Sequence, residues 1–103
     1  PFANLAVPTD GISLDAEGCV WVACPYFSYG DSGGWVRVAD GGEIKQVIAL
    51  EDSDKSAYAC MLGGADGRDL WLCESTVLGR DRFQGDGRIR KVRVDVTMAA
   101  GQF

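Results

Sequence analysis

Three carboxylates lie close together near the start of the chain: Asp10, Asp15 and Glu17. Carboxylate oxygens are ligands that hard divalent cations such as Ca²⁺ prefer, and a carboxylate can also accept a proton in catalysis. A strand between Asp10 and Asp15 would separate them by about 16 Å, whereas two oxygens on one Ca²⁺ lie at most about 5 Å apart. The sequence therefore predicts that Asp10 and Asp15 do not share one metal ion.

The elements that would position these residues are strands. Helical periodicity is nearly absent, and short runs rich in Val, Ile and Trp alternate with Gly/Asp turns, which predicts an all-β fold. We expect strands over 12–14, 19–24, 35–39 and 43–50, and again over 58–62, 70–73 and 88–96. The order restarts after about 50 residues, with Trp71 echoing Trp21, and this period is typical of β-propeller blades. A small sandwich of about eight strands is the alternative.

Strands that run antiparallel from the inner edge of a blade outwards reverse alternately at two rims. Asp10, Tyr58 and the loops 25–34 and 75–87 are therefore expected at one rim. The acidic residues of the short turns are expected at the opposite rim: Asp15, Glu17, Asp40, Asp66 and Asp69. Because a turn Asp commonly accepts hydrogen bonds from nearby backbone N–H groups, we interpret Asp15, Glu17 and Asp66 as structural.

Aromatic residues gather at the predicted Asp10 rim. Tyr26, Phe27 and Tyr29 lie in the first long loop, and Tyr58 begins an inner strand. They are candidates to line a substrate pocket; for Tyr26 and Phe27, packing between loops is the alternative. Glu74, at the end of a strand, is expected to be exposed to solvent. The cations between Arg88 and Arg93 are expected on a solvated edge strand.

Composition narrows the function classes. The 103 residues carry a formal net charge of −5, so no nucleic-acid partner is expected, and no apolar run approaches a membrane span. The chain has no His, which excludes a Ser-His-Asp triad within it. The four cysteines are dispersed, so a structural zinc site is not expected. Reduced core cysteines, and with them a cytoplasmic protein, are the expectation.

Three parts of the sequence carry a resemblance to a known family. The stretch from Asp10 to Gly18, followed by Val20-Trp21-Val22-Ala23, resembles a segment of the senescence-marker-protein/gluconolactonase (regucalcin-like) family. The run from Ala59 to Arg68, followed by Leu70-Trp71-Leu72, is similar to the next conserved run of that family. The stretches 87–89 and 92–96 look like its C-terminal strand.

The resemblance implies a six-bladed β-propeller of which this chain would supply about the last two blades, as an open fragment. Residues 1–8 would then be the tail of a preceding blade, 9–54 one blade, and 55–103 a final, incomplete blade. The family's metal site uses an Asp, an Asn and a Glu, and its Asp carries over to Asp10. The other two ligands lie in earlier blades. Calcium is the expected cofactor, with zinc, magnesium or manganese as alternatives.

The leading hypothesis for function is a metal-dependent lactonase that opens sugar-like lactones, with Asp10 as metal ligand and catalytic base. We expect the chain to be inactive alone, because its metal site would lack most ligands. The remaining blades would be its partners. A non-catalytic propeller that binds small molecules or a protein is the second hypothesis. A third is that copies of the chain assemble, three of them making six blades.

Overall fold

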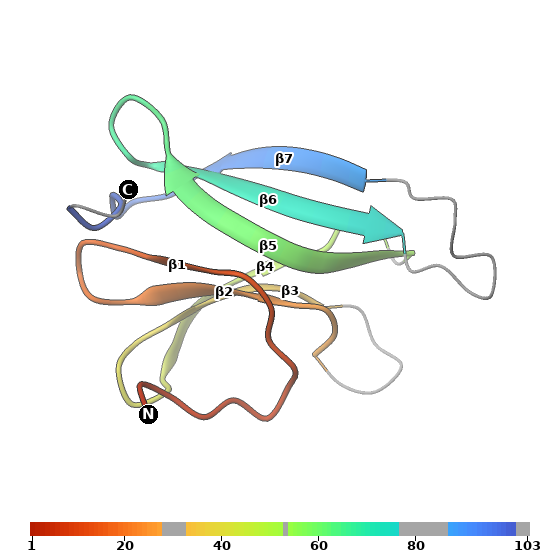
Figure 1. Cartoon of the computed structure of the whole chain (residues 1–103), viewed down its shortest axis with the longest axis horizontal. Coiled ribbons are helices and arrows are strands. Elements are labelled where there is room, and N and C mark those ends of the chain that lie inside the picture. The colour runs from red at the N-terminus through yellow and green to blue at the C-terminus, as the bar shows by residue number, and fades with distance from the viewer. Residues whose placement is uncertain (28–32, 53, 77–86, 101–103) are drawn as a thin grey trace.

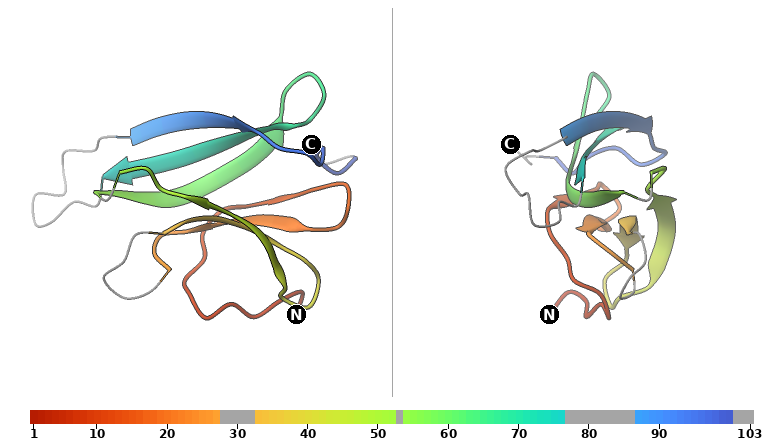
Figure 2. Two further views of the ribbon diagram at one scale, coloured as in Figure 1. Left: turned by 180° about the vertical axis from the view of Figure 1, so that it is seen from behind. Right: turned by 90° about the vertical axis from the view of Figure 1, so that its right-hand side faces the viewer.

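The structure, a computed structural model, describes residues 1–27, 33–52, 54–76 and 87–100, which form two antiparallel sheets that stack on one another (Figures 1 and 2). The first sheet has the strand order β1-β2-β3-β4 and the second β5-β6-β7. The strands are β1 (Ile12–Leu14), β2 (Val20–Cys24), β3 (Gly34–Val38), β4 (Ile44–Ala49), β5 (Lys55–Gly63), β6 (Asp69–Thr76) and β7 (Gly87–Arg93). The predicted all-β fold is confirmed, and no helix that could span a membrane occurs among the described residues.

Side chains of the first sheet alternate between two faces because each strand is pleated. On β2, Trp21 and Ala23 face the second sheet, whereas Val22 and Cys24 belong to a separate apolar cluster on the far face. The register pairs Trp21 with Arg37, so both lie on the face toward the second sheet. The same face thus carries the apolar core at one end and polar groups at the other.

The core lies between the two sheets. Its buried members come from both of them: Trp21, Ala23, Trp35, Ala57, Cys60, Leu62, Leu70, Leu72 and Val94. Hydrogen bonds cross the same gap, since the indole Nε1 of Trp35 donates to the carbonyl of Ala59 at 3.0 Å. The inner strands β1 and β5 also lie side by side (Figure 1), and the Leu62 N–H donates to Ser13 Oγ at 3.0 Å. Burial of this shared apolar surface is what holds the sheets together.

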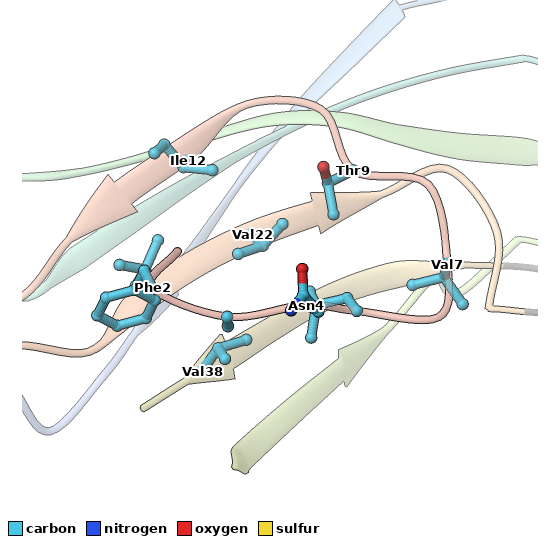
Figure 3. A pocket seen from close by; sticks show the side chains of 10 residues that line it. Phe2, Asn4, Val7, Thr9, Ile12, Val22 and Val38 are labelled. Atoms are coloured by element: carbon cyan, nitrogen blue, oxygen red, sulfur yellow. The ribbon is translucent and has the colours of Figure 1, made fainter. Parts of the chain in front are cut away.

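The N-terminal segment covers the far face of the first sheet. Ala3, Leu5 and Val7 pack on the cluster that contains Val22 and Val38, and the Phe2 carbonyl accepts a hydrogen bond from the turn after β3. A cavity of about 300 Å³ remains between the segment and the sheet (Figure 3); Phe2, Asn4, Thr9, Ile12, Val22 and Val38 are among the residues that line it. The segment therefore shields part of a sheet face that would otherwise be open.

The strand prediction was wrong at the end of the second sheet. The expected strand 88–96 ends at Arg93, and the next residues cross toward the first sheet. The Val94 N–H donates to the Arg68 carbonyl at 2.9 Å, and the Thr97 carbonyl accepts from the Ala16 N–H at 2.8 Å. These bonds to two turns replace the continued pairing with β6, so the segment links the sheets at the rim where β1 ends.

Candidate functional site

Asp10 is fixed through its backbone at the entrance to β1. Its N–H donates to the Ala23 carbonyl at 2.8 Å, and the next N–H, of Gly11, donates to the Tyr58 carbonyl at 3.0 Å. The Asp10 side chain is exposed, and among the described residues its carboxylate has no hydrogen bond or ion pair. A positioned backbone thus presents a carboxylate with its lone pairs available.

The glycine that follows Asp10 is required for a steric reason. A Cβ on Gly11 would lie 3.0 Å from the Ala59 Cα and 3.2 Å from the Tyr58 carbonyl oxygen. Only glycine lets the backbone entering β1 approach β5 this closely. The motif therefore marks the contact between the inner strands that places Asp10.

The predicted pocket residues are brought together in part. The Ser56 Oγ donates to the Pro25 carbonyl at 2.9 Å, so the loop after β2 and the start of β5 meet at the Asp10 rim, as predicted. Tyr26 and Tyr58 are each partly exposed there. Phe27 instead packs on the apolar cluster of the far sheet face, which is closer to the packing alternative. Tyr29 lies outside the described residues.

The Asp10 rim offers part of what a metal site needs. Ca²⁺ takes about six to eight oxygen ligands, and Asp10 supplies one carboxylate. Within the described ranges no three His, Cys, Asp or Glu side chains lie together in a way that could hold an ion. Asp10 fits the chemistry of a hard cation as one ligand, and the other ligands would have to lie outside these residues.

Asp15 and Glu17, at the opposite rim, make the structural contacts that were predicted for them. Asp15 is buried, and its Oδ1 accepts from the N–H groups of Glu17 at 2.9 Å and Cys19 at 3.0 Å. Its Oδ2 accepts from Arg37 Nε at 2.7 Å, and Arg37 also binds Glu17 at 2.9 Å. The hydrogen bond to Asp15 is the main reason that the pKa of Arg37 is raised. Asp15 thus closes the β1–β2 turn and anchors β3.

Asp66 has the same role in the second sheet. Its carboxylate accepts hydrogen bonds from Arg93, at 2.6 and 2.9 Å, and from the Arg68 N–H at 3.1 Å. The Arg93 guanidinium is the first cause that holds the pKa of Asp66 below its usual range. Asp66 therefore ties a turn to β7 and is not a free base.

The prediction of a solvent-exposed Glu74 was wrong. Its side chain is fully buried, and its Oε1 accepts from Arg88 Nε at 2.9 Å and from Arg90 Nε at 2.8 Å. Arg88 Nη2 also forms an ion pair with Asp52 Oδ2 at 2.7 Å, and Arg90 Nη1 forms one with Glu51 Oε1 at 2.7 Å. The network of ion pairs therefore reaches the segment that follows β4. Two cations of the edge strand β7 therefore serve an internal ion pair network.

The buried thiol of Cys60 is not suited to act as a nucleophile. All four cysteines are unpaired, and burial raises the pKa of Cys60 to about 12. A thiol with a raised pKa is a poor nucleophile because the thiolate is the reactive form. The prediction of unpaired, largely buried cysteines is confirmed.

Comparison with known proteins identifies the family. No curated protein matches the chain. Residues 2–76, which include β1 to β6 and Asp10, match the family described as SMP-30/Gluconolactonase/LRE-like region. This family is known for a β-propeller fold and includes lactonases, and two stacked antiparallel meanders agree with such a fold. The chain belongs to the SMP-30/gluconolactonase/LRE-like family.

Proposed function

We propose that this chain forms part of a metal-dependent lactonase that hydrolyses sugar-like lactones, with Asp10 as metal ligand and base. The observation that carries the proposal is the Asp10 carboxylate, which is exposed and without a partner among the described residues, while its backbone is held by β2 and β5. Family membership supports the reaction class. Calcium is the cation that this proposal puts first.

The reaction needs little from the protein beyond positioning and proton transfer. A hard divalent cation, when bound, polarises the lactone carbonyl and acidifies water. Asp10 would hold the cation through one carboxylate oxygen and accept a proton from the attacking water through the other. Water adds to the carbonyl carbon, the ring C–O bond breaks, and the ring oxygen takes up a proton, so that a hydroxy acid is released.

Aromatic residues of the same rim would orient the lactone. Tyr26 and Tyr58 are partly exposed beside the entrance to β1, where a flat apolar ring can stack against a sugar-like ring. Phe27 packs against the sheet and would support the loop without contacting the substrate. Tyr29 lies outside the described residues and stays a candidate from the sequence alone.

Further blades would complete the site. In a six-bladed arrangement this chain would supply two adjacent blades, and Asn and Glu ligands from other blades would face Asp10 across the channel. The isolated chain would then be inactive, because a single carboxylate binds a divalent cation weakly.

The test compares variants of the protein expressed from its full reading frame. Hydrolysis of D-glucono-δ-lactone is followed by pH-stat with Ca²⁺ and after removal of the metal by EDTA. Asp10→Asn is expected to lower kcat at least about 100-fold, since it removes both charge and base. Asp40→Asn, at the opposite rim, is the matched control and should keep full activity. The isolated 103-residue chain should show only the spontaneous rate; full activity of Asp10→Asn would disprove the proposal.

A non-catalytic binding propeller is the second candidate. The observation that favours it is that the described residues bring no group of three candidate metal ligands together, and a binding protein needs no metal site. In that case lactones or related polyols would bind without being hydrolysed, with or without EDTA.

A further inference from the structure

A second, polar cavity of about 250 Å³ lies at the rim opposite Asp10. It opens between the first sheet and the segment that crosses over after β7. Its walls are formed by Glu17, Trp21, Arg37 and Gln46 on one side and by Val94, Asp95 and Val96 on the other. Because the extended stretch from Asp10 to Asp15 spans about 16 Å, this cavity is distinct from the site of the proposed lactonase.

The floor of the cavity follows from strand register. Trp21 on β2 pairs with Arg37 on β3, and Arg37 pairs with Gln46 on β4. Directly opposed residues of antiparallel strands project on the same face, so these three side chains form a row toward the second sheet. The opposing wall is held in place by the hydrogen bonds of Val94 to Arg68 and of Thr97 to Ala16.

Trp21, in the floor of the cavity, carries a buried donor without a hydrogen-bond partner. Trp21 is 1% exposed, and its indole Nε1 is buried without a hydrogen-bond partner. Trp35 offers an internal comparison, since its Nε1 on the same sheet face donates to the Ala59 carbonyl at 3.0 Å. A buried N–H without an acceptor is unfavourable, so a ligand that offers an oxygen to the Trp21 indole, which would donate to it, would be stabilised by that hydrogen bond.

Other polar groups of the cavity have unused capacity. Arg37 donates from Nε to Asp15 and from Nη2 to Glu17. Its Nη1 makes no hydrogen bond within the described part of the chain. The side chains of Gln46 and Asp95 likewise make no hydrogen bond to described residues. The cavity is therefore lined both by hydrogen-bond donors and by hydrogen-bond acceptors that have unused capacity.

The balance of charge and hydrogen-bonding capacity defines a ligand class. Two carboxylates, Glu17 and Asp95, face one cation, Arg37, so the walls carry a negative surplus that disfavours an anion. Indole and guanidinium N–H groups require acceptors, whereas carboxylate and amide oxygens require donors. Hydroxyl groups supply both. We propose that this cavity binds a small neutral polyhydroxy compound of monosaccharide size.

Binding is tested by NMR on the 103-residue chain labelled with ¹⁵N. The chain has three tryptophans, so each indole Nε1–H gives one resolved cross-peak. On titration with D-glucose, the Trp21 cross-peak should shift saturably, while that of Trp35, already bonded to Ala59, should not. D-glucuronate and D-glucosamine serve as anionic and cationic analogues of similar size, and both should bind more weakly than D-glucose.

Substitutions of cavity residues test whether the shift of the Trp21 cross-peak reports binding in this cavity. Gln46→Ala and Asp95→Asn are each expected to weaken D-glucose binding about three- to tenfold, the range for one lost hydrogen bond. Asp40→Asn lies at the same rim outside the cavity walls and should leave affinity unchanged. Spectral dispersion of each variant reports whether it is folded.

Several results would overturn the proposal. These are no saturable shift of Trp21 at any concentration up to the solubility of D-glucose, equal shifts of Trp21 and Trp35, or tighter binding of either charged analogue. Because no lactone turnover is measured, failure here leaves the proposed lactonase standing, and loss of the lactonase proposal leaves this cavity unaffected.

Discussion

At the scale of single residues, environment sorts the carboxylates into two kinds. Asp15 and Glu74 are buried, and each accepts hydrogen bonds from arginine. Asp10 is exposed and unpartnered among the described residues. A buried carboxylate with arginine partners holds strands in place, whereas a free carboxylate at a fixed backbone position can bind a ligand.

Glu74 gives a prediction at this scale. Glu74→Gln should lower the free energy of unfolding by about 2–3 kcal/mol, because it leaves Arg88 and Arg90 without the charge they share, while their own exposure moderates the loss. Urea denaturation measures the change. The matched control is Glu51→Gln, since Glu51 pairs with Arg90 from a side chain that is 68% exposed; its effect should stay below about 1 kcal/mol. If both variants lowered the free energy of unfolding equally, the burial of Glu74 would not explain its contribution to stability.

The burial of Glu74 could have been read from the sequence. Glu74 follows Leu70 and Leu72 at a spacing of two, which places it on the same strand face as two buried leucines. Its partners Arg88 and Arg90 come from β7 with the same spacing. What the sequence could not supply was that these two strands pair in a register that brings all three charges together.

At the scale of elements, the approach of β1 to β5 decides where Asp10 lies. This approach depends on Gly11, since a Cβ there would meet the Ala59 and Tyr58 backbone. Backbone atoms cannot move aside as a flexible side chain can, so the inner strands would have to separate.

Gly11→Ala is therefore expected to destabilise the chain by about 1–3 kcal/mol. In the protein with its full reading frame it should also lower lactonase activity without removing any catalytic group. Thermal or urea unfolding and the pH-stat assay give the two readouts. Gly87→Ala is the control, because a Cβ there meets only the Glu74 carbonyl oxygen at 3.9 Å. If Gly11→Ala matched Gly87→Ala in stability, the close approach would not be needed.

The alternation of apolar residues also explains why the strand predicted over 88–96 was too long, since β7 ends at Arg93. Val92, Val94 and Val96 alternate as they would in a longer strand, and local pattern alone favours continuing β7. In the structure Val94 joins the inter-sheet core instead. Hydrogen bonds to the turns of both sheets replace the β6–β7 hydrogen bonds that a longer strand would make. The sequence of this segment alone does not show which of the two sets of bonds forms.

At the scale of the whole molecule, the two sheets share one core and should unfold together. Trp35 is fully buried in that core, and its indole N–H bonds the second sheet. Trp35→Ala should cost about 3–5 kcal/mol, and hydrogen exchange should accelerate equally at Val22 in the first sheet and Leu72 in the second.

Trp71→Ala is the matched control for that experiment. Trp71 lies on the outer face of the second sheet and is 39% exposed, so its loss should cost clearly less than half as much. Faster exchange confined to the first sheet in Trp35→Ala would mean that the sheets are independent units.

The sequence by itself determined the all-β class, the family, the sorting of carboxylates between two rims, and the structural role of Asp15. The fold class and the positions of the carboxylates follow from strand periodicity, glycine-bearing turns and the length of a strand, whereas the family follows from the motifs that begin at Asp10 and Ala59. All of these features are local. Only the tertiary structure decided that Glu74 meets Arg88 and Arg90, that residues 94–96 leave the second sheet, and that Phe27 packs away from the rim. It also revealed the polar cavity beside Trp21. Each of these depends on pairing between segments far apart in the chain, where the free energy of packing overrides what a short stretch prefers.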